Sequence, residues 1–176
     1  MTRIIAGEWR GHSLPKLKTG SVRPTTDRAR TVLFDTLRDV RGLRVLDLYS
    51  GTGALGFESL SRGAESLVSV DHDRKYIQLQ KEWVHTHEKP FKAHIGDVER
   101  VLQRLEGQFD LIFADPPYES GISESILDLI EQKIASGGRF VYERDKKSDT
   151  LLQSKIFNLV KEKIIAQTRI EIYKAD

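Results

Sequence analysis

The spacing of hydrophobic and polar positions changes near residue 43 of the chain. From there on, short apolar runs alternate with amphipathic segments whose apolar positions recur at helical spacing. Such alternation predicts an α/β fold, a doubly wound sheet that is mostly parallel, with an antiparallel C-terminal strand and helices on both faces. The expected strands are 44–48, 66–70, 91–95, 109–114, 139–143, 157–164 and 168–173, and the expected helices are 54–62, 73–85, 98–105 and 123–135.

The residues before this point predict an arm and one helix. Short apolar pieces on either side of a turn with two glycines, within the first 14 residues, predict a β-hairpin or an irregular arm. A polar loop follows, and a helix is expected to begin at a hydroxyl cap, Thr25 or Thr26, and to end at Gly42. We therefore expect a basic N-terminal arm over residues 1–24 and one larger domain over residues 25–176.

Composition limits the classes of protein that fit. With 176 residues, 39% of them hydrophobic, the chain is long enough for one domain with its own core. It contains no cysteine, which excludes disulfide bonds and thiolate zinc sites, and its five histidines lack metal-ligand spacing. No apolar run approaches the roughly 18 residues of a membrane span, and the first residues lack the apolar core of a signal peptide. We expect a cytoplasmic monomer that binds neither a metal nor a membrane.

Charge is distributed unevenly along the chain. Residues 1–30 carry a net charge of +5 and the remainder carries −3, which together give the overall +2. A basic arm on a mildly acidic body favours a polyanionic partner. The alternative interpretation is a solvated surface without a partner, and charge alone favours this alternative.

Candidate chemistry gathers where the expected parallel strands end, because ligands of doubly wound sheets bind outside the carboxyl ends of the strands. The segment from Gly51 to Gly56 reads G-x-G-x-x-G and lies between a strand and a helix, which favours a nucleotide site. Asp71 follows Gly51 by twenty residues at the end of the second strand, where a carboxylate can bind two ribose hydroxyls. The alternative is that the glycines only allow close packing of a helix on a strand.

Two further aspartates favour S-adenosylmethionine over a nicotinamide dinucleotide. Asp47 lies four residues before Gly51, where it would repel a pyrophosphate but attract the ammonium and sulfonium groups of S-adenosylmethionine. Asp97 follows the third strand, where it can accept a hydrogen bond from an adenine amino group or can instead cap a helix. The expected cofactor-binding residues are Asp47, Tyr49, Ser50, Gly51, Gly53, Asp71, His72, Asp97 and Val98.

The fourth strand ends in the sequence Asp115-Pro116-Pro117-Tyr118, whose four residues are the expected catalytic residues. Two prolines fix the backbone and remove two N–H donors, which leaves carbonyl groups able to accept hydrogen bonds. The Asp115 carboxylate and the Pro116 carbonyl can together accept both hydrogens of an exocyclic amine and align its lone pair on a sulfonium methyl group. Tyr118 offers an aromatic face to a base removed from its stack. The alternative is a turn that only ends a strand.

Together these motifs resemble the RsmD family of bacterial methyltransferases, which act on a guanine N2 amine of 16S ribosomal RNA. The resemblance extends over nearly the whole chain, and its blocks are 3–11, 23–28, 46–56, 60–64, 115–118 and 168–173. It implies a Rossmann-like class I domain that uses S-adenosylmethionine to methylate one guanine in small-subunit rRNA, either free or in an assembling particle. It also implies that the arm and the segment that follows it contact RNA, at Arg10, Arg23, Thr25 and Arg28.

The chain departs from the family pattern at four positions without losing a catalytic group. Thr31 and Asp71 stand where the family usually has Glu, Tyr118 where it has Phe, and Trp83 where it often has Asn. Two alternative functions remain open at this point. One is an amino-methyltransferase that acts on adenine or cytosine of another RNA or of DNA. The other is a non-catalytic RNA-binding assembly factor that retains the fold.

Overall fold

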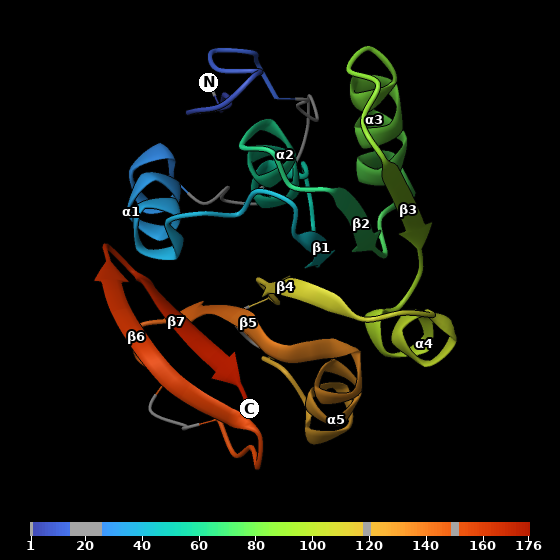
Figure 1. The fold of residues 1–176 in the computed structure, drawn as a ribbon. Helices are drawn as coiled ribbons and strands as arrows, with labels where there is room; N and C mark the ends of the chain where they lie inside the picture. The colour runs from blue at the N-terminus through green and yellow to red at the C-terminus, as the bar shows by residue number, and fades with distance from the viewer. Residues whose placement is uncertain (1, 15–25, 118–120, 149–151) are drawn as a thin grey trace.

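The computed structural model describes residues 2–14, 26–117, 121–148 and 152–176. Within these residues, seven strands form one sheet in the order β3-β2-β1-β4-β5-β7-β6 (Figure 1). The strands are β1 (Arg44–Leu48), β2 (Ser66–Asp71), β3 (Phe91–Ile95), β4 (Phe109–Ala114), β5 (Ile134–Asp145), β6 (Phe157–Ile165) and β7 (Thr168–Ala175). The helices are α1 (Asp27–Leu37), α2 (Ala54–Ser61), α3 (Arg74–His85), α4 (Val98–Arg104) and α5 (Glu124–Lys133).

The directions of the strands confirm the doubly wound sheet. Strands β3, β2, β1, β4 and β5 are all parallel. Strand β7 pairs antiparallel with both β5 and β6, so β7 is the strand that runs against the others. The chain moves outward from β1 to β3 and then returns to the other side of β1 to form β4. Ligands of doubly wound sheets bind in the crevice at such a reversal, outside the carboxyl ends of the strands.

The helices divide between the two faces of the sheet. Helices α1, α2 and α3 lie on one face together with the N-terminal arm, and α4 and α5 lie on the other (Figure 1). Each face has its own core of fully buried side chains, which includes Phe57 and Phe113 on the first face and Ile130 and Phe140 on the second. Burial of this apolar surface is the main favourable contribution to folding. None of the described helices is both long enough and apolar enough to cross a membrane.

The N-terminal arm closes on itself around the isolated antiparallel bridge between Arg3 and Ser13. The Ile4 N–H donates to the His12 carbonyl and the Gly11 N–H donates to the Ile4 carbonyl, each at 2.9 Å. The arm is therefore an irregular hairpin with one bridged pair of residues, in agreement with the second of the two expected forms. Ile4, Trp9 and Leu14 are buried in the first core beside side chains of α1 and α2. The arm thus shares a hydrophobic core with the rest of the chain.

Strand β5 begins earlier than the sequence pattern predicted. We expected a helix that ends at Ala135 and a strand that starts at Arg139, but α5 ends at Lys133 and β5 starts at Ile134. The backbone of Ile134 is already extended, so the helix passes into the strand without a loop. The two glycines that follow, Gly137 and Gly138, lie inside the strand. A shift in the register between β4 and β5 accommodates them, as in a β-bulge.

Helix α2 lies directly against β1 and β2 because Gly56 has no side chain. A Cβ atom at this position would lie 2.7 Å from both Cδ atoms of Leu67 on β2 and 3.0 Å from Oδ2 of Asp47 on β1. The main-chain N–H of Gly56 donates a hydrogen bond to that Asp47 oxygen at 3.0 Å. The third glycine of the motif therefore sets the distance between helix and sheet.

We expect Gly56→Ala to lower the free energy of unfolding by about 1–3 kcal/mol, the range for overpacked cores. The sign is informative, because alanine in place of glycine inside a helix ordinarily stabilises by about 0.5–1 kcal/mol. Urea denaturation measures the change. The control is Gln103→Ala on the exposed side of α4, which should stay within about 0.5 kcal/mol of the wild type. A Gly56→Ala protein as stable as the wild type would contradict the close approach of α2.

Candidate functional site

Three carboxylates meet at the carboxyl ends of neighbouring strands. Asp47 lies one residue before the end of β1, Asp71 ends β2, and Asp115 directly follows β4. Strands β2 and β4 both pair with β1, which brings the three ends to the same edge of the sheet. The negative charges of Asp115 and Asp71 both act on Asp47. The structure therefore brings together three of the residues that the sequence predicted for the site.

Burial changes the acidity of two of these carboxylates, Asp47 and Asp115. Desolvation raises the pKa of Asp47 from 3.8 to about 7, and the charges of Asp115 and Asp71 add to the rise. The hydrogen bond from the Gly56 N–H acts in the opposite direction but is outweighed. Burial also raises the pKa of Asp115 to about 7. Strongly shifted carboxylates that share a crevice are typical of functional sites.

The turn between β1 and α2 adopts a conformation that few residues tolerate. Tyr49, Gly51 and Gly53 all have positive φ angles, of 58°, 51° and 79°. For glycine this costs little, but for tyrosine it is uncommon, and such outliers cluster at binding sites. Gly53 also has no room for a side chain, because a Cβ atom would lie 2.7 Å from the Phe57 ring. The first two glycines of the motif thus shape the turn, whereas the third packs the helix.

Side chains from β2 and α3 hold this turn in place. One oxygen of Asp71 accepts a hydrogen bond from the Gly51 N–H at 2.7 Å, and the other accepts one from the Asp73 N–H at 2.8 Å. Gln80, which is fully buried, donates to the Ser50 hydroxyl at 2.9 Å and to the Gly51 carbonyl at 2.8 Å. Sequence reasoning missed Gln80. Its signal was an amide in line with apolar residues on the buried face of α3.

The loop between β3 and α4 brings a fourth acidic residue to this edge. Asp97 caps α4, because its Oδ1 accepts a hydrogen bond from the Arg100 N–H at 3.2 Å, which was the alternative interpretation of this residue. The charge of Asp97 contributes to raising the pKa of Tyr49 to about 12, after a larger contribution from burial. Val98 begins α4, and its side chain is buried in the second core. Only the main chain of Val98 can therefore face a ligand.

Other expected residues occupy the rim of the site or lie outside the described part. His72 is exposed, with its Nδ1 3.6 Å from the Oδ1 of Asp71. After β4, Pro116 is buried and Pro117 is exposed, and the Pro117 carbonyl accepts a hydrogen bond from the Gly121 N–H at 3.2 Å. Tyr118 lies outside the described residues.

Two of the four expected RNA-binding residues lie within the described part of the chain and two lie outside it. Arg10 on the arm and Arg28 in the first turn of α1 are exposed on the face of the sheet that carries α1, α2 and α3. Arg23 and Thr25 lie outside the described residues. Among the residues that the structure describes, no three histidine or acidic side chains are grouped in a way that could hold a metal ion.

Two relatives in sequence cover almost the whole chain. The Ribosomal RNA small subunit methyltransferase D of Escherichia coli strain K12 is 30% identical over 99% of this chain and 90% of its own length. The protein of the same name from Haemophilus influenzae is also 30% identical, over 98% of this chain and 93% of its own length.

Solved structures of methyltransferases are also similar to this chain. The yhhF protein of Escherichia coli is 29% identical, with a TM-score of 0.89 over 99% of this chain and 97% of that protein. The methyltransferase SMU.776, solved in complex with SAH, is 15% identical, with a TM-score of 0.67 over 84% of this chain and 48% of that protein. At this identity the match supports the fold alone. Residues 2–174 match the family described as "Conserved hypothetical protein 95". The chain therefore belongs to this family, which is the RsmD family that its motifs resemble.

Proposed function

We propose that this protein transfers a methyl group from S-adenosylmethionine to the exocyclic N2 amine of a guanine in 16S rRNA. The chain is a methyltransferase that depends on S-adenosylmethionine. The observation that carries the proposal is the position of Asp115. It follows β4 directly and lies on the same edge as the carboxylates of β1 and β2. The relatives named rRNA small subunit methyltransferase D supply the substrate class.

The residues at the edge of the sheet suit a cationic nucleoside. Burial raises the pKa of Asp47, and the charges of Asp115 and Asp71 add to the rise, so a positive charge placed among the three is attracted. Asp47 would bind the ammonium group of S-adenosylmethionine. Asp71 would bind the ribose hydroxyls. Each of its two oxygens already accepts one hydrogen bond from a main-chain N–H group, and each has a second lone pair that can accept another. The second oxygen of Asp97 is left for the adenine amino group.

The turn between β1 and α2 would surround the cofactor through Tyr49, Ser50, Gly51 and Gly53. His72 would lie at the edge of the cofactor site. When bound, S-adenosylmethionine supplies a methyl group on a positively charged sulfur atom. The protein has then to hold the amine of the substrate in line with that methyl group.

Asp115 and Pro116 would perform this alignment. The Asp115 carboxylate accepts one N–H of the guanine amine and the Pro116 carbonyl accepts the other, so that the nitrogen lone pair points at the methyl group. As the N–C bond forms and the S–C bond breaks, the nitrogen becomes positive and must lose a proton. A carboxylate with a pKa of about 7 can accept it near neutral pH. Tyr118 would stack on the base once it has left its helix, and Pro117 keeps the motif rigid.

The basic arm would supply contacts to the RNA phosphates. Arg10, Arg23, Thr25 and Arg28 are the residues that we assign to this surface. We propose that the protein acts as a monomer in the bacterial cytoplasm, where ribosomal subunits are assembled, on naked 16S rRNA or on an assembling small subunit.

Transfer of tritium from labelled S-adenosylmethionine to unmodified small subunits tests the proposal, followed by mapping of the labelled nucleoside. Label in N2-methylguanosine of 16S rRNA is the expected result. Label in adenine or cytosine would instead support a different amino-methyltransferase. Binding of the cofactor without any transfer would support a non-catalytic assembly factor.

We expect Asp115→Ala to reduce the rate of methyl transfer by at least about 100-fold while leaving cofactor affinity nearly unchanged, because the amine loses its alignment. Asp115→Asn should keep part of the activity, since an amide oxygen still accepts a hydrogen bond. For the wild type, the pKa of about 7 predicts that kcat/KM falls as the pH drops through 7, because the protonated carboxyl is a weaker acceptor. In Asp115→Asn this fall should disappear. Near-normal turnover in the alanine variant would exclude the role.

We expect Asp47→Asn to stabilise the cofactor-free protein at pH 8 and to weaken binding of S-adenosylmethionine. The pKa of Asp47 is about 7 in the folded protein and about 3.8 when unfolded, so folding takes up a proton between these values. The free energy of unfolding therefore falls as the pH rises from about 4 to 7, and the penalty is complete above 7. Its removal should add up to about 4 kcal/mol at pH 8 and little at pH 4. Urea denaturation at both pH values measures this, and an unchanged pH dependence would contradict it.

We expect the double substitution of Arg10 and Arg28 by Gln to weaken RNA binding and to flatten its dependence on salt. Each lost phosphate contact reduces the slope of log affinity against log salt by about one. Cofactor affinity and thermal stability should change little, because both side chains are exposed. The matched control replaces Arg100 and Arg104, which are exposed on α4 across the sheet. Equal salt slopes in the wild type and the arm variant would place the RNA contact elsewhere.

A further inference from the structure

The first residues of the chain are held by a carboxylate that is completely buried. Glu58 on α2 has no exposed surface. One of its oxygens accepts a hydrogen bond from the Ile5 N–H at 2.8 Å, and the other accepts one from the Ala6 N–H at 3.0 Å. The second oxygen also receives the Arg62 Nε–H at 2.7 Å, which balances the charge of Glu58 inside the protein. A buried carboxylate of this kind requires partners, and the arm supplies two of them.

Ser61, one turn further along α2, holds the next part of the arm. Its hydroxyl donates to the Ala6 carbonyl at 2.6 Å and accepts from the Trp9 N–H at 3.0 Å. Its main-chain carbonyl accepts from the Glu8 N–H at 2.8 Å. Between these contacts, Gly7 has a φ of 85°, and a Cβ atom there would lie 1.9 Å from the Ser61 carbonyl oxygen. The arm passes so close to α2 at this point that only glycine fits.

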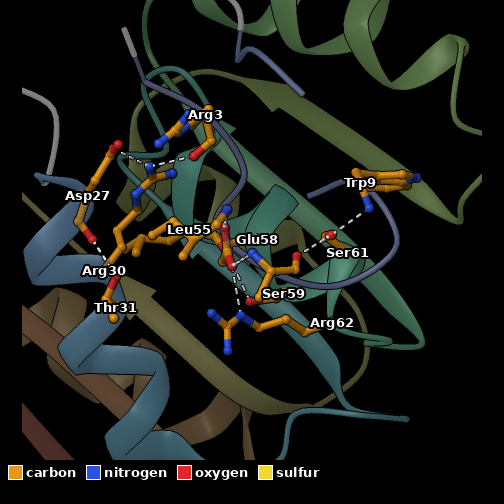
Figure 2. Close-up of polar contacts among 12 residues, drawn as sticks. Arg3, Trp9, Asp27, Arg30, Thr31, Leu55, Glu58, Ser59, Ser61 and Arg62 are labelled. Carbon is orange, nitrogen blue, oxygen red and sulfur yellow. Dashed lines mark hydrogen bonds and ion pairs between the residues drawn. The ribbon is translucent and has the colours of Figure 1, made fainter. Parts of the chain in front are cut away.

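A third anchor comes from α1. Arg30 is fully buried, and its guanidinium donates to the Arg3 carbonyl at 2.7 Å and to the Asp27 carboxylate at 2.7 Å. Figure 2 shows the arm crossing above Glu58 and Ser61, with Arg30 beside Arg3 at one end and Trp9 at the other.

These side chains of α1 and α2 contact the main chain of the arm, and not its charged side chains. The Arg3 and Arg10 side chains are consequently left at the surface, where both residues are exposed. Gly53 is the last residue of the cofactor turn between β1 and α2, caps the N-terminus of α2, and lies only five positions before Glu58. One short helix therefore fixes the positions of both the cofactor turn and the basic arm.

We propose that Glu58 and Ser61 are positioning residues for the RNA substrate. They hold the arm by its backbone at a fixed distance from the cofactor turn, so that the cationic side chains of the arm meet the RNA phosphates in register with the target base. This inference rests on the proposed function, because it assumes that the arm contacts RNA. It predicts that loss of the anchor weakens RNA binding through Arg10 while the cofactor site stays intact.

The experiment compares Ser61→Ala, Glu58→Gln and the control Glu65→Gln, which changes an exposed carboxylate beyond the end of α2. Hydrogen exchange reports directly on the anchor, because the amides of Ile5, Ala6 and Trp9 should lose protection in the first two variants only. Calorimetry with S-adenosylmethionine should give affinities within about twofold of the wild type. Steady-state methylation of small subunits should give an RNA KM raised by about 5–20-fold, the loss expected for one or two hydrogen bonds, with kcat nearly unchanged.

A double-mutant cycle tests whether the anchor acts through the arm. If it does, Glu58→Gln should raise the RNA KM much less in an Arg10→Gln background than in the wild type, because the two residues serve one contact. Fully independent effects, or equal losses in kcat and cofactor affinity, would overturn the proposal and leave Glu58 a structural residue. If Glu58→Gln does not fold, the cycle is run with Ser61→Ala. A wild-type protein that methylates no RNA would contradict the proposed function instead, and the exchange data would still show whether the anchor exists.

Discussion

Helix α2 is buried on every side, and the arrangement of the whole site depends on that constraint. All eight of its residues are buried, although three of them are the polar residues Glu58, Ser59 and Ser61. A helix in that position needs a small residue where it meets the sheet and a hydrogen-bond partner for each polar group. Gly56 meets the first requirement on the side of β1. The arm meets the second for Glu58 and Ser61 on the opposite side, through its own main-chain groups, whereas Ser59 donates to the Leu55 carbonyl within the helix.

Burial of charge has opposite consequences on the two sides of this helix. Glu58 faces an arginine and two N–H donors, so its negative charge is balanced within the protein. Asp47 faces two other carboxylates and receives one hydrogen bond from the helix, so its charge is not balanced. The first arrangement stabilises the fold. The second is a strained electrostatic arrangement, which natural proteins retain where a ligand of opposite charge is bound.

The sequence was informative where chemistry follows a local pattern. Asp47, Gly51, Gly53 and Asp71 were predicted because the ends of parallel strands and the glycine turn can be recognised within a few residues. Gln80 and Glu58 were not predicted as parts of this arrangement. Their partners in the glycine turn and in the arm lie 29 to 53 positions away in the sequence. The local pattern can place Gln80 on the buried face of α3, but it cannot show which groups these side chains bond.

The arm shows the same limit in another way. The short apolar pieces around its turn indicated a hairpin or an irregular arm, but they did not show that side chains of α2 share the arm's main-chain hydrogen bonds with the arm's own two halves. Trp83, which stands where the family often has Asn, completes the surroundings of Trp9: the two rings meet edge to face with centroids 5.4 Å apart. Contacts of this kind depend on the tertiary fold, and a one-dimensional pattern does not contain them.

The contact between Ile5 and Glu58 has a consequence for how the chain folds during synthesis. The two residues are 53 positions apart, so the arm leaves the ribosome well before the helix that supplies its partners. At about 5–20 residues per second, several seconds separate the two events. The arm is therefore among the segments that cannot become ordered early, and its long-range contacts form only after α2 has packed on the sheet. A nascent chain that stops before α2 would present the arm as an unpaired basic peptide.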